Sequence, residues 1–380
     1  MKKVSINKYD FFGKVLFVLF AISWGYGEYI NNVNDDFKYI FAIINILIIF
    51  FQLIINRNNI KECLFKSETK NVLFFSIAAL IISLCFQLKN SNYSSLAWKE
   101  FFYFSFPVIY AFCLINNNKK DNLDFYFNIL FIVFVISFFI KYGSLINLSN
   151  IQNISFNNSY SVFESAYSTI FVQFFIYYFI RKKKILYIIS ALLCILSLKR
   201  LDIIFLLIFP FLYKLYKDKG VSKKTTFFIK TFFVVSPFIM MFIYSNEFNE
   251  FVYNTFNLNL NQFTTGRYRL VNYVTGGNLV NNGLGTIEIF LKNLTGETNI
   301  HCDVIKIFFE TTIIGSFLLS NCYFNVVKEN KMLTFVLVYL FMILCLSHCL
   351  TSVIVWLLFF LNVGYYKSII LKEGKANEKS

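Results

Sequence analysis

Charged side chains are scarce in this sequence, and their scarcity excludes most soluble folds. Only 15% of the 380 residues are Asp, Glu, Lys or Arg, whereas 57% are hydrophobic and the mean hydropathy is +0.59. A soluble domain has about a quarter of its residues charged. A water-soluble globule of this size could not bury so much apolar surface, so the composition indicates an integral membrane protein.

Motifs for nucleotides and metals are also missing. The chain has no phosphate-binding loop of the Walker A type and no dinucleotide-binding fingerprint. Its eight cysteines form no CxxC pair, and its two histidines, His301 and His348, are far apart in the sequence. Zinc sites use closely spaced groups of Cys and His. We therefore expect no metal and no cofactor.

Prolines are few, and the positive net charge has a topological explanation. With only three Pro, the chain lacks the paired Gly/Pro-interrupted spans that mark inverted-repeat transporters. A formal net charge of +15 would attract nucleic acid in a soluble protein. Here Lys and Arg cluster between apolar runs, as they do in the cytoplasmic loops of membrane proteins. We expect membrane lipid, and not nucleic acid, as a partner.

Twelve apolar runs predict the fold. A transmembrane helix needs about 20 apolar residues, within a range of about 17 to 25. The predicted spans are 11–28, 39–55, 72–88, 101–115, 125–140, 162–180, 185–199, 203–216, 225–244, 304–320, 332–347 and 351–366. The sequence therefore predicts an all-α integral membrane protein, a polytopic bundle of about 12 transmembrane helices that forms one membrane domain over residues 1–380.

The distribution of basic residues predicts the orientation of this bundle. Most of the Lys and Arg lie in one alternating set of connecting segments, which includes both ends of the chain. The positive-inside rule places that set in the cytoplasm, so both termini are expected to be cytoplasmic. The one long connecting segment, 245–303, then becomes an extracytoplasmic loop.

The apolar region that starts at residue 185 can be divided in two ways. A single span over 185–213 would put the basic residues at its two ends on opposite sides of the membrane, against the positive-inside rule. Two short helices, 185–199 and 203–216, keep those residues on one side. We therefore predict a hairpin whose turn is recessed below the outer membrane surface.

Arg200 lies in the turn of this hairpin. A charge recessed in a membrane protein is costly and usually faces a cavity or a charged partner. Arg200 is therefore a candidate for binding an anionic substrate. Two alternatives remain at this point, a local pair with Asp202 and a position at the outer membrane surface, while Lys199 is expected to be solvated.

A second cationic segment lies inside the long loop, around Arg267. Thr265 is a plausible N-cap, and the apolar residues of 270–274 share one side of a helical wheel with Arg267. The first turn of such a helix would present free N–H groups and a guanidinium, which suit a phosphate or pyrophosphate. The alternative is that Arg267 and Arg269 extend to lipid head groups or cap loop carbonyls.

His301 and Glu310 follow the loop at the start of the tenth predicted span. An imidazole can accept a proton from a sugar hydroxyl at neutral pH, although a histidine at a helix start is more often a structural hydrogen-bonding group. Glu310 lies about two turns inside the span and either pairs with an arginine of another helix or binds substrate. His348, at the outer end of the eleventh span, is a weaker candidate, because we expect no group of functional residues to converge on it.

Three segments together resemble the O-antigen polymerase and ligase family (Wzy/WaaL type). Residues 196–200 are similar to the family's Ser-x-Ser-Arg turn, with Lys199 in place of the second Ser. Residues 265–285 resemble its Gly-Arg … Trp … Gly-x-Gly segment, with Tyr273 where Trp is common. Residues 301–315 resemble its His-Asn … Glu-x-Gly-Ile-Ile-Gly helix start, with Cys302 in place of Asn. The resemblance covers residues 185–320, and the order of the segments agrees.

This resemblance implies a metal-independent membrane glycosyltransferase of the GT-C type in a bacterial cytoplasmic membrane. Its substrates would be oligosaccharide repeat units linked to undecaprenyl pyrophosphate, which it would polymerise into O-antigen or capsule, and a chain-length regulator protein would be a partner. Arg200 and Arg267 would neutralise the pyrophosphate and His301 would be the candidate base. The remaining substrate-binding candidates are Arg269, Gly266 and Glu310.

Two other functions are compatible with the same sequence. An O-antigen ligase, which transfers a finished glycan to a lipid acceptor, would share the fold and the lipid-linked donor. A polysaccharide flippase or transporter would instead place charges and helix breaks near the middle of the bilayer. The sequence favours the polymerase over the transporter because its cations gather at one face and in one long loop.

Overall fold

The described part of the chain is entirely helical apart from turns and connecting segments. The computed structural model describes residues 8–30, 37–55, 63–117, 121–147, 149–150, 163, 165–197, 199–217, 219–264, 266–277 and 279–377. Within these ranges no β-strand occurs. The all-α prediction is therefore confirmed for the residues that the structure describes.

A helix is present at each of the twelve ranges predicted from the apolar runs. These helices are α1 (Lys8–Tyr29), α2 (Phe37–Ile55), α4 (Lys66–Asn90), α5 (Leu96–Asn116), α6 (Asp121–Tyr142), α8 (Tyr167–Ile180), α9 (Lys184–Leu196), α10 (Arg200–Tyr216), α11 (Lys223–Ile243), α16 (Asp303–Val327), α17 (Lys331–Leu346) and α18 (Val353–Asn377). Five of them, α2, α4, α5, α6 and α11, are long and apolar enough in the described residues to cross a membrane. The chain thus has the helices of a membrane protein.

The region around residue 200 forms two helices and not one. Helix α9 ends at Leu196, α10 begins at Arg200, and the two helices contact one another. The break falls at Lys199, whose backbone is extended (φ −94°, ψ 115°). The prediction of two helices is therefore confirmed, and the single helix over 185–213 is excluded; the depth of the turn in the membrane stays a prediction.

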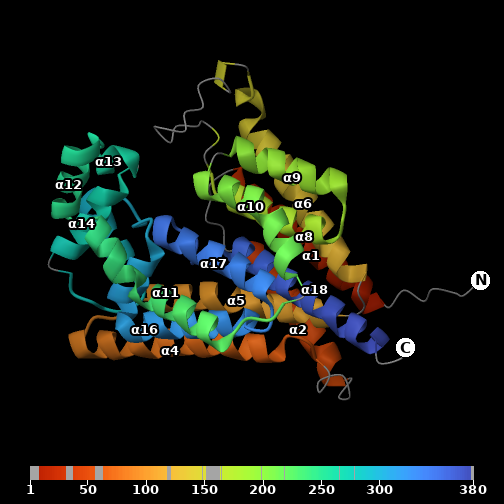
Figure 1. Ribbon diagram of the computed structural model, residues 1–380. Coiled ribbons are helices and arrows are strands. Elements are labelled where there is room, and N and C mark those ends of the chain that lie inside the picture. Colours follow the sequence, from red (N-terminus) through yellow and green to blue (C-terminus); the bar gives the residue numbers. More distant parts are fainter. Residues whose placement is uncertain are drawn as a thin grey trace, which may run out of the picture.

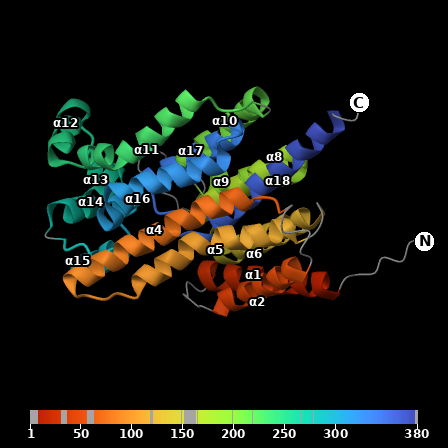
Figure 2. The same cartoon turned by 90° about the horizontal axis from the view of Figure 1, so that it is seen from below.

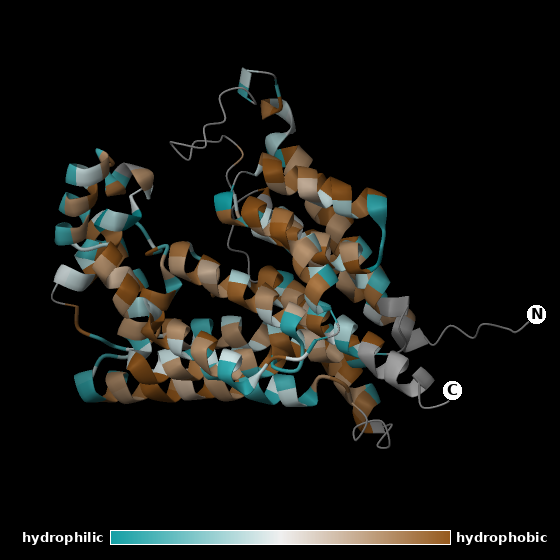
Figure 3. Ribbon diagram, in the orientation of Figure 1, coloured by the Kyte–Doolittle hydropathy of each residue, from teal (hydrophilic) through white to brown (hydrophobic). Residues whose placement is uncertain are grey.

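The long helices run side by side, with their apolar residues along their length (Figures 1–3). Hydrophilic residues concentrate in the turns at the ends of the helices (Figure 3). Helices α12 to α15 gather at one end of the bundle, while α1 begins and α18 ends at the opposite end (Figure 2). The bundle therefore has two distinct polar ends.

The segment 245–303 contains four short helices. They are α12 (Asn246–Phe256), α13 (Leu260–Phe263), α14 (Arg267–Gly276) and α15 (Thr286–Thr295). Only the one near Arg267 was predicted from the sequence. Helix α14 contacts both α13 and α15, and α15 contacts α16, so the segment is a small helical cap joined to the bundle.

Aromatic packing fixes the positions of the helices on which the site depends. The ring of Phe205 in α10 stacks on Tyr339 in α17, with ring centroids 4.0 Å apart. The hydroxyl of Tyr339 also donates a hydrogen bond to Asp202 (2.9 Å). Offset stacking of aromatic rings stabilises a contact by about 0.5–1.5 kcal/mol beyond its buried area. These contacts hold the start of α10 against α17.

The segment before α15 packs closely against α4. Gly283 has φ +87°, and a Cβ atom there would lie 2.4 Å from the Cα of Ser83. The next amide, that of Leu284, donates a hydrogen bond to the Ser83 hydroxyl (2.9 Å). Asn90 adds two hydrogen bonds from α4 to the segment, to the Asn281 carbonyl and to the Asn282 side chain (2.7 Å each). Gly283 therefore permits both the turn and the close contact.

We predict that Gly283→Ala destabilises the folded chain by about 2–4 kcal/mol. Alanine is strained in the left-handed conformation of this residue, and its methyl group would collide with the backbone of α4 at Ser83. Thermal unfolding of the detergent-solubilised protein measures the effect. Gly276→Ala is the matched control, since a Cβ atom at that position meets nothing within 4 Å. Equal unfolding temperatures for the two variants would contradict this account of Gly283.

Candidate functional site

A cavity lies at the end of the bundle that carries the helical cap. Its volume is about 250 Å³, and its walls come from the start of α10, the end of α11, helices α13 and α14, and the end of α17. Three cationic side chains line it: Lys199, Arg200 and Arg267. The structure therefore brings together the two arginines that the sequence singled out, although 67 residues separate them along the chain. Lys199, predicted to be solvated, faces the same cavity.

Arg200 is the first residue of α10, and an aromatic ring supports it. Its guanidinium carbon lies 5.0 Å from the centre of the Phe263 ring in α13. A cation over an aromatic face is stabilised by about 0.5–2 kcal/mol, depending on its exposure to water. This contact joins the hairpin to the helical cap and orients a cation that remains half-buried at the cavity.

Asp202 has a structural role beside Arg200. Its carboxylate is fully buried and accepts hydrogen bonds from the hydroxyls of Thr169 (3.0 Å) and Tyr339 (2.9 Å). Buried carboxylates need such donors because leaving them unsatisfied is costly. The side chain therefore ties the first turn of α10 to α8 and α17, and so fixes the helix start at which Arg200 lies.

Arg267 is the first residue of α14, and the cap of this helix differs from the prediction. The N-cap is Gly266, with φ +84°, and the predicted N-cap Thr265 lies outside the described residues. The amide of Arg267 donates to the Thr264 carbonyl (3.3 Å), and that of Tyr268 to the Thr264 hydroxyl (3.2 Å). These two N–H groups are therefore not free for an anion. At this helix start the guanidinium of Arg267 is the candidate anion-binding group.

The apolar face of α14 is as predicted. Leu270, Val271 and Val274 are all buried, so the helix lies with this face against the bundle. Arg267 is half-buried at the cavity, whereas Arg269 is exposed and does not line it. The structure thus separates the two arginines of the motif, and only Arg267 is placed to share a ligand with Arg200.

His301 lies in the connection between α15 and α16, with a left-handed backbone (φ +55°). Such a conformation is uncommon for residues other than glycine, and strained backbones often occur at functional sites. Burial, together with the charges of His348 and Arg267, lowers the pKa of His301 to about 4. The imidazole is therefore uncharged at neutral pH and close enough to Arg267 to respond to its charge.

Asp303 and His348 form a pair that the sequence did not reveal. The Nδ1 atom of His348 lies 2.8 Å from one carboxylate oxygen of Asp303, and its Nε2 atom lies 2.8 Å from the Thr351 hydroxyl. The other carboxylate oxygen accepts the amides of Cys349 and Leu350, at 2.6 Å each. The expectation that nothing converges on His348 is therefore wrong, because its partner comes from α16, 45 residues earlier.

A second cavity opens beside His348. Its volume is about 270 Å³, and its polar lining includes Lys99 and Glu288 together with Thr298 and Asn299. Asn299 and Asp303 lie two residues on either side of His301. The pKa of His301 responds both to His348, which lines this cavity, and to Lys199 and Arg267, which line the other. His301 itself is among the lining residues of neither cavity, while its neighbour Asn299 lines the second.

Glu310 lies deeper in the bundle, away from both cavities. It is fully buried in α16, and one carboxylate oxygen accepts the amide of Ile287 at the start of α15 (3.0 Å). Nearby, Lys306 forms a buried ion pair with Glu100 of α5. The structure thus gives Glu310 a contact that anchors the helical cap, and does not place it with the arginines.

Comparison with known proteins adds no relative: no protein-family model, no curated protein and no solved structure matches this chain.

Proposed function

We propose that this protein polymerises lipid-linked oligosaccharide repeat units at the outer face of a bacterial cytoplasmic membrane. In this proposal the bundle crosses the membrane with about 12 helices, both termini are cytoplasmic, and 245–303 lies outside the cytoplasm. One observation carries the proposal. Arg200 and Arg267, from two separate segments that resemble the O-antigen polymerase and ligase family, line a single cavity.

The cationic cavity suits a pyrophosphate leaving group. A hydroxyl of one repeat unit attacks the anomeric carbon of another, the new C–O bond forms, and the bond to undecaprenyl pyrophosphate breaks with its electron pair. Negative charge grows on the pyrophosphate as that bond breaks. Preorganised cations at this position stabilise the transition state more than the ground state, which is the condition for catalysis. Arg200 and Arg267 supply these cations, and Lys199 adds a third.

His301 is the candidate base for the attacking hydroxyl. Its lowered pKa keeps the imidazole uncharged at neutral pH, so a ring nitrogen is available for the proton that the hydroxyl loses. His348, which is paired with Asp303, lines the second cavity, where the acceptor sugar would bind. Gly266 sets the start of α14, and Arg269 is assigned no contact with the pyrophosphate.

The pKa of His301 predicts a pH dependence. Because the folded pKa, about 4, lies below the ordinary value of 6.5, the unfolded chain binds this proton more readily. The free energy of unfolding is therefore independent of this group above about pH 6.5, and it falls as the pH decreases toward 4. The polymerisation rate in isolated membranes should have its acid limb near pH 4, and His301→Gln should remove that limb. A limb near pH 6.5 in the wild type, or an unchanged profile in His301→Gln, would count against this role.

A deletion strain tests the proposed function. A polymerase predicts that long-chain surface polysaccharide disappears while single repeat units are still attached to their acceptor. The loss of all attached glycan would instead identify a ligase. The proposal fails if the length distribution of the polysaccharide is the same with and without the gene.

A transporter or flippase is the second candidate, and one feature favours it. Helix α16 is interrupted at Thr312 (φ +62°, ψ −173°), two residues after the buried Glu310 and six residues after Lys306. A broken helix with buried charges is typical of transport sites. This function predicts that the deletion strain accumulates lipid-linked units on the inner leaflet, whereas a polymerase defect leaves them on the outer leaflet.

A further inference from the structure

A groove between α11 and α16 combines lysines with exposed apolar side chains. It has a volume of about 730 Å³ and lies between the first half of α11 and the second half of α16. Lys223 and Lys328 are exposed at its rim. Lys230 lies two turns further along α11, about 10 Å deeper along the helix axis. Because α16 starts beside the helical cap, this groove is at the opposite end of the bundle.

Lys230 is held in place inside the groove. Its ammonium donates hydrogen bonds to the side-chain oxygens of Asn321 and Asn325, both at 2.8 Å. These acceptors are neutral, so they orient the ammonium without cancelling its charge. An ammonium has three N–H donors. Two are used by the asparagines, and the third is available to a ligand in the groove.

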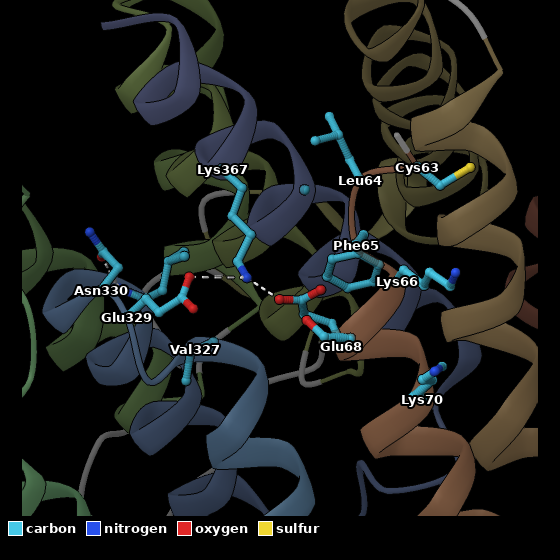
Figure 4. A pocket seen from close by; sticks show the side chains of 13 residues that line it. Cys63, Leu64, Phe65, Lys66, Glu68, Lys70, Val327, Glu329, Asn330 and Lys367 are labelled. Carbon is cyan, nitrogen blue, oxygen red and sulfur yellow. Dashed lines mark hydrogen bonds and ion pairs between the residues drawn. The ribbon is translucent and has the colours of Figure 1, made fainter. Parts of the chain in front are cut away.

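The groove keeps a net positive charge. Its only acidic lining residue among those described is Glu329, whose carboxylate lies 3.6 Å from the ammonium of Lys367 in the neighbouring cavity. Figure 4 shows Lys367 between Glu329 and Glu68, with which it also forms an ion pair. No ion pair to Lys223, Lys230 or Lys328 occurs within the described ranges. The three lysines are thus left for an anion from outside the chain.

The other walls of the groove are apolar and face outward. Phe227 is 65% exposed on α11 and Phe317 is 53% exposed on α16, and Val234 also lines the groove. Helix α11 is long and apolar enough to cross a membrane, so the exposed ring of Phe227 on it would face lipid chains. The groove therefore offers cations at a helix end and an apolar wall that continues toward the middle of the bundle.

We propose that this groove binds an anionic glycerophospholipid. The lipid phosphate lies among Lys223, Lys230 and Lys328, and an acyl chain follows Phe227 and Phe317. Basic pockets between membrane helices recognise anionic head groups, and the volume here suits a head group with the first part of its chains. A soluble anion would use the lysines but not the apolar wall. This inference needs only a chain embedded in a membrane, and does not depend on the proposed polymerase activity.

Native mass spectrometry of the detergent-solubilised full chain tests this proposal, with dioleoyl-phosphatidylglycerol and dioleoyl-phosphatidylcholine as probes. The wild type should bind phosphatidylglycerol more tightly than phosphatidylcholine. Each basic residue near a membrane surface contributes about a fivefold gain in affinity, so Lys223→Gln/Lys328→Gln should weaken phosphatidylglycerol binding by about 10- to 30-fold. Both lysines are exposed, so the variant is expected to fold.

The matched control is Lys89→Gln/Lys292→Gln, which removes two exposed lysines at the other end of the bundle. It should bind phosphatidylglycerol as the wild type does. A second arm adds glycerol 1-phosphate, which should not displace the lipid at equal concentration. Equal affinity for the two lipids, equal losses in the two double variants, or displacement by glycerol 1-phosphate would each overturn the proposal.

Discussion

Arg267→Ala should abolish long-chain surface polysaccharide while the protein remains folded in the membrane. The guanidinium lines the cavity that it shares with Arg200, and the proposed role is to neutralise charge that grows on the departing pyrophosphate. Removing one preorganised donor of this kind lowers a rate by about 10²- to 10³-fold. The length distribution of polysaccharide from a strain that carries the variant measures the effect.

The same helix provides a matched control for this result. Arg269 is exposed two residues further along α14 and does not line the cavity, so Arg269→Ala should leave the long chains intact. Arg267→Lys keeps the charge but loses the planar fork that contacts two oxygens at once, and should recover only part of the activity. Normal long chains in Arg267→Ala would refute the proposed catalytic cavity.

Lys306→Met should destabilise the fold more than any surface substitution in this chain. The side chain of Lys306 is 7% exposed and that of its partner Glu100 is 3% exposed, and the fully buried Glu310 lies one turn further along α16. Loss of the ammonium leaves the buried carboxylate of Glu100 without its cation. Removing one partner of a buried ion pair costs about 3–5 kcal/mol. Thermal unfolding of the full chain in detergent measures the loss.

A second substitution separates the ion pair from simple packing. Glu100→Gln/Lys306→Met removes the uncompensated charge of Glu100, and should regain more than half of the stability lost in Lys306→Met. Lys292→Met, on the exposed face of α15, should change the stability by less than about 0.5 kcal/mol. If the double variant is as unstable as Lys306→Met, the effect is one of packing and the electrostatic explanation is wrong.

The positions of the long helices could be predicted because they depend on local composition. A run of apolar residues needs a helix to satisfy its backbone in lipid, whatever the rest of the chain does. The four short helices of 245–303 carry no such signal, and only the apolar residues after Arg267 indicated one of them. Their boundaries depend on contacts with the bundle, such as that of Gly283 with Ser83.

The candidate site was predictable only where a motif marked it. Arg200, Arg267 and His301 were found from local segments, and the structure places all three at one end of the bundle. The assignment of Glu310 to the substrate is not supported by its position, because its carboxylate anchors the start of α15 instead. The pair of Asp303 and His348 was not predicted, because the two residues are 45 positions apart in the sequence.

The sequence by itself determined an apolar helical chain with basic ends, because the length and composition of each segment decide whether it can form a helix in lipid. Only the tertiary structure decided which charged side chains lie close together. Lys306 reaches Glu100 across 206 residues, and Arg200 joins Arg267 across the boundary between the hairpin and the helical cap. Such contacts depend on how helices pack against one another, and helix packing is decided by side-chain shape over the whole bundle and not by any local run of residues.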